Sequence, residues 1–214
     1  MSSTIRTLFP LWRPPATRGL VLLAILIGFL AAAPSPSHAD GHKAWSCGPY
    51  SVSDELGGFH ITNVSGKGTR NDPAVIDEEL DSPAPVTLTI RTTRPTVPFD
   101  PSGDYASGQL YLRINALNNS GEPWIEFAFE LQSAVDYPSD DADGLSFDQR
   151  NVNPDNIHSA NYAEYHREMR PYDRLLFKNG LADPRHVAEF EFLVTDYTPH
   201  LAIYMVQEPH VPSS

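Results

Sequence analysis

Cysteine is almost missing from this 214-residue sequence, since Cys47 is the only one. A single cysteine cannot form an intrachain disulfide, so the fold must be held by its hydrophobic core. Two roles are open for Cys47: a small, partly buried residue with no function, or a free thiol that bridges two molecules. It stands well beyond the apolar N-terminal run, which argues against lipid attachment at this position.

Long hydrophobic runs are also scarce, and the one present spans 15 residues, 19–33. A bilayer span needs about 20 residues. Three arginines precede the run, and Ser37-His38-Ala39 follows it with small residues at the −3 and −1 positions of a cleavage site. This layout predicts a secretory signal peptide over 1–39, read by the general secretion route because no twin arginine is present. A retained signal anchor is the alternative.

Basic residues are few: 15 Lys and Arg stand against 27 Asp and Glu. Cleavage after Ala39 removes three arginines and no acid, which leaves a net charge of −15 with histidine neutral. Such a chain is repelled by phosphate backbones and anionic lipid. We therefore expect neither nucleic acid nor a membrane surface as a partner, and no membrane span after cleavage.

Helical periodicity is rare in what remains, whereas alternation of apolar and polar residues is common. Strands are expected at 59–64, 74–80, 86–93, 186–195 and 201–206, separated by Gly-, Pro- and Asn-rich turns. The region 109–131 is predicted to be a central hairpin, with its turn at 118–123. One short helix is expected at 159–170, where Tyr162, Tyr165, His166 and Met169 recur at helical spacing.

These elements predict an all-β fold: one antiparallel β-sandwich, Ig-like or jelly-roll, of seven to eight strands. The expected organisation is a signal peptide at 1–39, a flexible lead-in at 40–58, the sandwich at 59–207 and a disordered tail at 208–214.

Sequence signatures of catalysis are missing. The glycine-rich turn at 66–73 lacks the spacing of a phosphate loop, and there is no Gly-x-Ser-x-Gly elbow. Histidines lack the spacing of a transition-metal site. Glu126 and Glu130 would stand about 13 Å apart along a strand, further than glycosidase pairs. We therefore expect a protein that is not an enzyme and has no cofactor.

Two weaker binding sites are nevertheless suggested. The acidic stretch 139–144 partly matches the start of a calcium loop, so Asp140, Asp141 and Asp143 are candidate calcium ligands, although Arg150 occupies the position where the bidentate Glu belongs. A solvated acidic loop is the alternative. Trp124, Tyr111 and Tyr204 are candidate glycan-stacking residues if they share one exposed face.

Two stretches carry a resemblance: TRNDPAVIDEEL at 69–80, and NNSGEPW at 118–124 followed by FAFEL. They resemble exported bacterial β-sandwich proteins of unassigned function, which implies no catalytic residues. The ending LLFKNGLADPRHVAEFEFLVTD is similar to the last strands of secreted sandwich domains that carry a C-terminal sorting tail, although no apolar helix follows Pro209 here. The expected function is binding or structural, in the cell envelope or outside it, with an unknown envelope protein or glycan as the partner. A carbohydrate-directed protein, either a glycan-binding module or a hydrolase, is the alternative.

Overall fold

The computed structural model describes residues 43–140, 142–150 and 153–213. These residues form an all-β fold, as the sequence predicts. Their only helical element is a single 3-10 turn, η1 (Pro154–Asn156), and no helix among them is long and apolar enough to cross a membrane. The predicted signal peptide and Asp141 lie outside the described residues.

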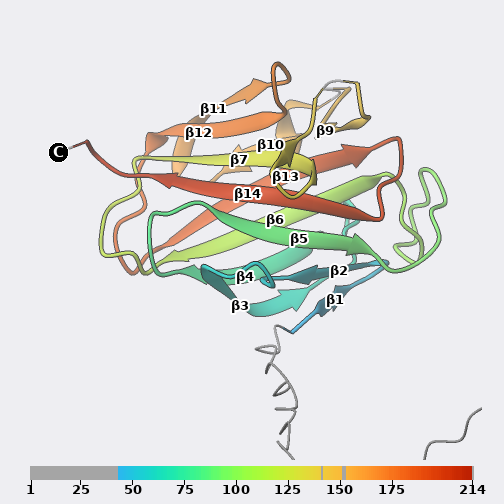
Figure 1. Cartoon of the computed structure of the whole chain (residues 1–214), viewed down its shortest axis with the longest axis horizontal. Helices are drawn as coiled ribbons and strands as arrows, with labels where there is room; N and C mark the ends of the chain where they lie inside the picture. Colours follow the sequence, from blue (N-terminus) through green and yellow to red (C-terminus); the bar gives the residue numbers. More distant parts are fainter. Residues whose placement is uncertain (1–42, 141, 151–152, 214) are drawn as a thin grey trace, which may run out of the picture. The chain divides into compact units, whose positions relative to one another are not determined.

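Two sheets contain all of the strands (Figure 1). The eight-stranded sheet has the order β1 (Trp45–Cys47), β2 (Tyr50–Ser53), β5 (Val86–Thr92), β14 (Ala202–His210), β7 (Glu126–Ala134), β12 (Arg174–Gly180), β11 (Tyr162–Glu168), with β8 (Tyr137–Pro138) paired to β7. The six-stranded sheet has the order β10 (Ile157–Ser159), β13 (Val187–Asp196), β6 (Gln109–Asn118), β4 (Ala74–Leu80), β3 (Phe59–Ser65), with β9 (Leu145–Phe147) paired to β13. The described strands are thus more numerous than the seven or eight predicted.

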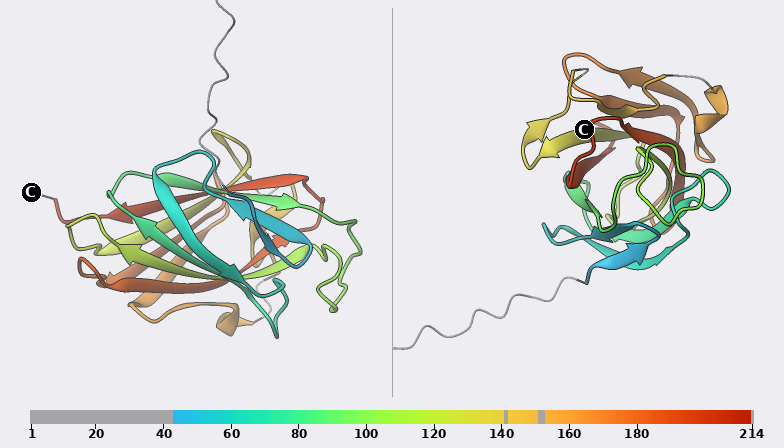
Figure 2. Two further views of the ribbon diagram at one scale, coloured as in Figure 1. Left: turned by 90° about the horizontal axis from the view of Figure 1, so that it is seen from below. Right: turned by 90° about the vertical axis from the view of Figure 1, so that its right-hand side faces the viewer.

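The two sheets face each other across a shared core and curve round it when seen end on (Figure 2). Their edges also approach, because β1 contacts β3 on one side and β10 contacts β11 on the other. Pairing is antiparallel throughout the described sheets except between β4 and β6, which run parallel. The prediction of a purely antiparallel sandwich is wrong at that pair.

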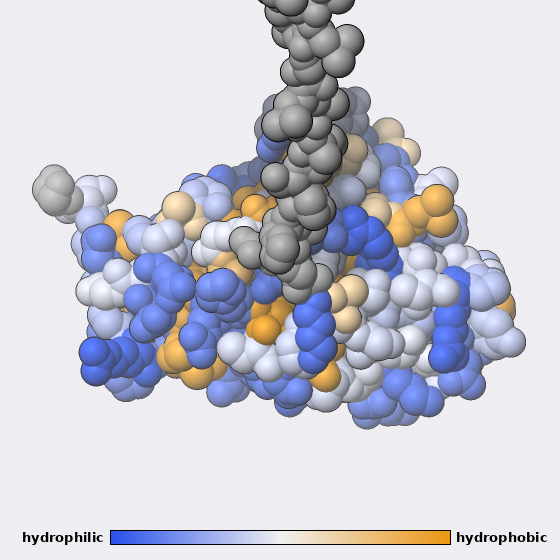
Figure 3. Space-filling view, turned by 60° about the horizontal axis from the view of Figure 1, so that its bottom comes forward, coloured by the Kyte–Doolittle hydropathy of each residue, from blue (hydrophilic) through white to orange (hydrophobic). Residues whose placement is uncertain are grey.

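Period-two alternation explains the core. Along β6 the buried side chains are Leu110, Leu112, Ile114 and Ala116, as predicted, and the intervening ones face outward. The centre of the core is aromatic: Phe129 packs against Phe177, Phe190 and Phe192 with ring centroids 4.7–6.1 Å apart. Burying each such ring contributes about 1.5–3 kcal/mol. The outer surface around β1–β4 shows hydrophilic residues broken by separate hydrophobic patches (Figure 3).

The predicted central hairpin is wrong, because β6 and β7 belong to different sheets. The segment between them is an arch that carries the chain across the core. Asn118 is buried at its base, donating from Nδ2 to the carbonyls of Glu122 and Ala182 at 2.8 and 2.9 Å. Alternation reveals which face of a strand is buried but not which sheet the strand joins.

The predicted helix at 159–170 is also wrong. That segment contains β11, which pairs with β12 in an antiparallel register that places Tyr165 opposite Phe177. Tyr162 is buried against Phe190 at 5.6 Å between ring centroids, while most of the strand is exposed at the sheet edge. The helical spacing of its aromatic residues was therefore coincidental, since ladder hydrogen bonds to β12 fix the backbone.

Both ends of the domain are more ordered than predicted. The expected flexible lead-in contains β1 and β2, and Cys47 and Val52 there are core residues. The expected disordered tail begins inside β14, which continues to His210. Pro209 lies within that strand, opposite Phe127.

Candidate functional site

A groove crosses the outer face of the six-stranded sheet at β6. It consists of three adjoining hollows of about 200, 230 and 220 Å³. The first and second share Arg70 and Tyr111, and the second and third share Phe99 and Ser107. We call this row of neighbouring hollows the β6 groove, defined by Arg70, Tyr111, Phe99, Gln109, Arg150 and Tyr197.

Alternation along β6 determines which of its side chains form the floor of the groove. Because Leu110 and Leu112 point into the core, Gln109, Tyr111 and Arg113 must face outward. The register pairs Arg113 with Glu191 of β13, whose carboxylate accepts a hydrogen bond from Arg113 Nε at 2.5 Å. The floor is therefore a fixed polar surface on a central strand.

The loop between β3 and β4 brings Arg70 to this floor. Gly68 has a positive φ of +77°, and its carbonyl accepts from the Tyr111 amide at 3.0 Å, which ties the loop to β6. A Cβ on Gly66 would lie 1.8 Å from the Pro73 carbonyl oxygen, so only glycine fits there. The glycine-rich turn thus serves to position an arginine beside a tyrosine.

Arg70 is held by neutral groups. Its Nε donates to the Tyr111 hydroxyl at 3.2 Å and its Nη2 to Asn156 Oδ1 at 2.5 Å. The guanidinium carbon lies 5.2 Å from the centroid of the Tyr111 ring, within the range of a cation–π contact. The far end of the groove has a similar arrangement, with Arg150 4.9 Å from the Tyr197 ring and 5.6 Å from the Phe99 ring.

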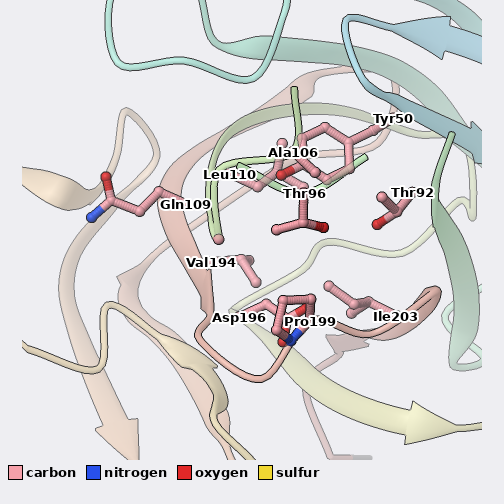
Figure 4. Close-up of a pocket in the computed structure, with 11 residues that line it drawn as sticks. Tyr50, Thr92, Thr96, Ala106, Gln109, Leu110, Val194, Asp196, Pro199 and Ile203 are labelled. Atoms are coloured by element: carbon pink, nitrogen blue, oxygen red, sulfur yellow. The ribbon is translucent and has the colours of Figure 1, made fainter. Parts of the chain in front are cut away.

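Next to this far end lies a small hollow of about 10 Å³, room for about one water molecule. Tyr50, Leu110 and Ile203 converge on it, whereas the Gln109 side chain is directed away from the others (Figure 4). Burial raises the pKa of Tyr50 to about 12, which keeps its phenol neutral. This hollow lies at one end of the core and is too small for an organic ligand.

The three residues proposed to stack on a glycan are not brought together. Trp124 is 0% exposed, and its indole Nε1 donates to Ser120 Oγ at 3.1 Å, so the expectation that it is a surface platform is wrong. Tyr204 is half-buried on β14 of the eight-stranded sheet, and Tyr111 lies on the other sheet. Only Tyr111 belongs to the groove.

Two of the three predicted calcium ligands, Asp140 and Asp143, accept hydrogen bonds within local turns. Asp140 Oδ1 accepts from the Ala142 amide at 2.8 Å, and Asp143 Oδ1 accepts from the Leu145 amide at 2.9 Å. No cluster of three or more acidic, His or Cys side chains suited to a metal occurs among the described residues, a set that excludes Asp141. The acidic loop instead meets Ser139, whose hydroxyl lies between Asp143 and the buried Asp173, 2.9 and 3.4 Å away.

Two carboxyls in the interior have raised pKa values. Burial raises the pKa of Asp173 to about 6 despite hydrogen bonds from Ser146 and Ser139, and the nearby Asp143 adds to the effect. Burial also raises the pKa of Glu78 to about 8. Neither residue lines the β6 groove.

Sequence reasoning missed most of the groove. It treated Arg70 only as part of a rejected phosphate loop, and Arg150 only as a misfit in a calcium loop. Phe99 and Tyr197 lie in two further loops, so no periodicity or motif links the four residues. Comparisons with known protein families, curated proteins and solved structures gave no match to this chain.

Proposed function

We propose that this chain is an exported protein that acts by binding, in the cell envelope or outside it, and that its ligand occupies the β6 groove. The observation that carries the proposal is that three neighbouring hollows share aromatic and arginine side chains, among them Arg70, Tyr111 and Phe99, in their walls. Binding sites combine apolar or aromatic surface with a few placed polar groups. Export rests on the signal-peptide pattern at 1–39, and mass spectrometry of the exported form should find Asp40 as its first residue.

A non-enzymatic role is supported by two of the four carboxylates that line the groove, Glu191 and Asp196, which are engaged by basic side chains. Glu191 pairs with Arg113 and contacts His158 at 3.4 Å, and Asp196 pairs with His200 at 2.8 Å. Carboxylates held in ion pairs are poor proton donors at neutral pH. The acids with raised pKa values, Glu78 and Asp173, are buried away from the groove. In the mass-spectrometry test of export described above, an intact N-terminus would indicate a retained signal anchor.

A carbohydrate is the ligand class that we propose first. Tyr111 and the 54%-exposed Phe99 offer ring faces, and Asn71 and Gln109 offer amides that hydrogen-bond hydroxyl groups.

We further propose a jelly-roll rather than an Ig-like sandwich, because from β4 to β7 each connection carries the chain into the opposite sheet.

The test uses the exported protein, expressed from the full chain, and its Tyr111→Ala and Tyr204→Ala variants. Both tyrosines are half-buried, but they lie on opposite sheets. Each protein is immobilised and exposed to the soluble glycans and proteins of its native envelope. We expect a component retained by wild type and Tyr204→Ala and lost with Tyr111→Ala. Equal retention by all three would place binding outside the groove and reject the proposal.

A further inference from the structure

The β6 groove contains two arginines, Arg70 and Arg150, that make no ion pair with an acid among the described residues. Arg70 contacts Tyr111 and Asn156, and Arg150 contacts the rings of Phe99 and Tyr197. Within the described part of the chain, neither makes an ion pair, whereas Arg91, Arg113 and Arg174 each pair with a glutamate. Arg94 and Arg167 likewise donate to backbone carbonyls rather than to an acid, so what distinguishes Arg70 and Arg150 is that both line one groove.

The acids that line the second and third hollows already have partners. Asp196 pairs with His200, and Asp100 accepts from the amide and hydroxyl of Ser102 at 3.1 and 2.5 Å. The contacts of Asp100 hold it in place but leave its charge uncompensated, because Ser102 is neutral. Asp155 and Glu191 line the first hollow, so four acids line the groove beside its two arginines. A negative group of a ligand would therefore have to bind at the guanidinium groups of Arg70 and Arg150 themselves.

The groove's other groups identify what carries the negative charge. Guanidinium binds planar carboxylates through two parallel hydrogen bonds. The exposed ring of Phe99, with the hydroxyl and amide groups of Ser107, Asn71 and Gln109, matches a sugar ring with several hydroxyls. A peptide would bind best by extending a sheet edge, but β6 is paired on both sides, with β4 and β13, and offers no free edge.

We propose that the β6 groove binds an acidic saccharide, in which Arg70 and Arg150 bind ring carboxylates and Phe99 and Tyr111 contact the sugar rings. The proposal rests on the binding function proposed above and specifies its ligand class. It predicts that affinity falls as salt rises, because the ion pairs at the groove are exposed.

The experiment measures calorimetric affinities of the exported protein for a panel of uronic-acid oligosaccharides: oligogalacturonate, oligomannuronate, oligoguluronate and hyaluronate fragments. Each is compared with its methyl ester, which keeps the ring and removes the charge. A poly-glutamate peptide of equal charge tests for unspecific attraction. Arg70→Gln and Arg150→Gln are compared with Arg174→Gln, which removes an arginine from the other sheet, and thermal melts verify that each variant is folded.

We expect at least one uronate to bind at least tenfold more tightly than its ester and than poly-glutamate. Arg70→Gln and Arg150→Gln should each weaken it at least tenfold, and Arg174→Gln should leave it within twofold. Equal affinity for the ester, or for poly-glutamate, overturns the proposal. If no uronate binds while a Tyr111-dependent envelope ligand exists, the acidic-saccharide inference fails and the binding function stands. If no uronate binds and no Tyr111-dependent envelope ligand exists, the acidic-saccharide inference and the proposed binding function both fail.

Discussion

Glu78 on β4 and Gln207 on β14 meet across the core, with Gln207 Nε2 donating to Glu78 Oε2 at 3.0 Å. Both side chains are buried. The other carboxyl oxygen of Glu78, Oε1, and the amide oxygen of Gln207, Oε1, have no partner among the described residues. A protonated Glu78 removes this deficit, since its hydroxyl can donate to the Gln207 carbonyl while its other oxygen accepts the amide. This polar contact between the two sheets therefore favours a neutral acid.

The pH dependence of stability follows from that pair. Burial, with a contribution from the negative charge of Asp54, raises the folded-state pKa of Glu78 from 4.5 to about 8. Between these values the unfolded chain has released a proton that the folded chain retains. The free energy of unfolding therefore falls as pH rises from about 4.5 to 8, by at most about 1.4 kcal/mol per pH unit from this group.

Replacing Glu78 by Gln should abolish this dependence. The amide keeps the shape, carries no charge and can both donate to and accept from Gln207. We expect Glu78→Gln to match wild type near pH 4.5 and to be increasingly more stable up to pH 8. Urea denaturation at pH 4.5, 6.5 and 8 checks this, and because Asp173 titrates in both proteins its contribution cancels. A variant equally or less stable than wild type at pH 8 would show that Glu78 is ionised in the fold.

Cys47 should be inert in the native protein. It is 1% exposed, and burial raises the pKa of its thiol to about 12, so almost no thiolate exists at neutral pH. We expect a thiol reagent to label it fully in denaturant and only at the rate of local opening in buffer. A protein that labels within seconds, or runs as a disulfide-linked dimer, would restore the bridging role considered from the sequence.

The arch between β6 and β7 gives a third prediction. The buried Asn118 donates two hydrogen bonds and its Oδ1 accepts from the amide and hydroxyl of Ser120 at 3.1 and 2.7 Å. Asn118→Asp removes both donors and places a charge beside two carbonyls, which should cost about 3 kcal/mol or more. The exposed neighbour provides the control: Asn119→Ser loses one exposed hydrogen bond to Asp81 and should cost no more than about 1 kcal/mol. Similar denaturation midpoints for the two variants would contradict this role.

The same segment shows what the sequence does and does not reveal. The strand at 109–118 and its buried face follow from alternation because period two is a local property. Alternation says less about 126–134, because Ala128 and Gln132 on its second face are buried as well. The arch could not be distinguished from a hairpin turn, since both use Asn, Gly and Pro. At 162–168 the deciding interaction was pairing with β12, which is non-local. The groove could not be predicted from the sequence for the same reason, because its residues Arg70, Phe99, Arg150 and Tyr197 come from four different loops.

Trp124 offers a final test of the arch and of the groove together. After the predicted cleavage, Trp45 and Trp124 are the only tryptophans, so Trp45→Phe leaves Trp124 as the single reporter. The Trp124 ring is 0% exposed, and its centroid lies 5.5 Å from that of the Phe127 ring. Its fluorescence should therefore have a short emission wavelength and resist quenching by acrylamide. Since Trp124 does not line the groove, a bound saccharide should leave its spectrum unchanged while protecting groove amides from hydrogen exchange. Strong quenching by acrylamide that a bound saccharide relieves would instead show that Trp124 is exposed and stacks on the saccharide.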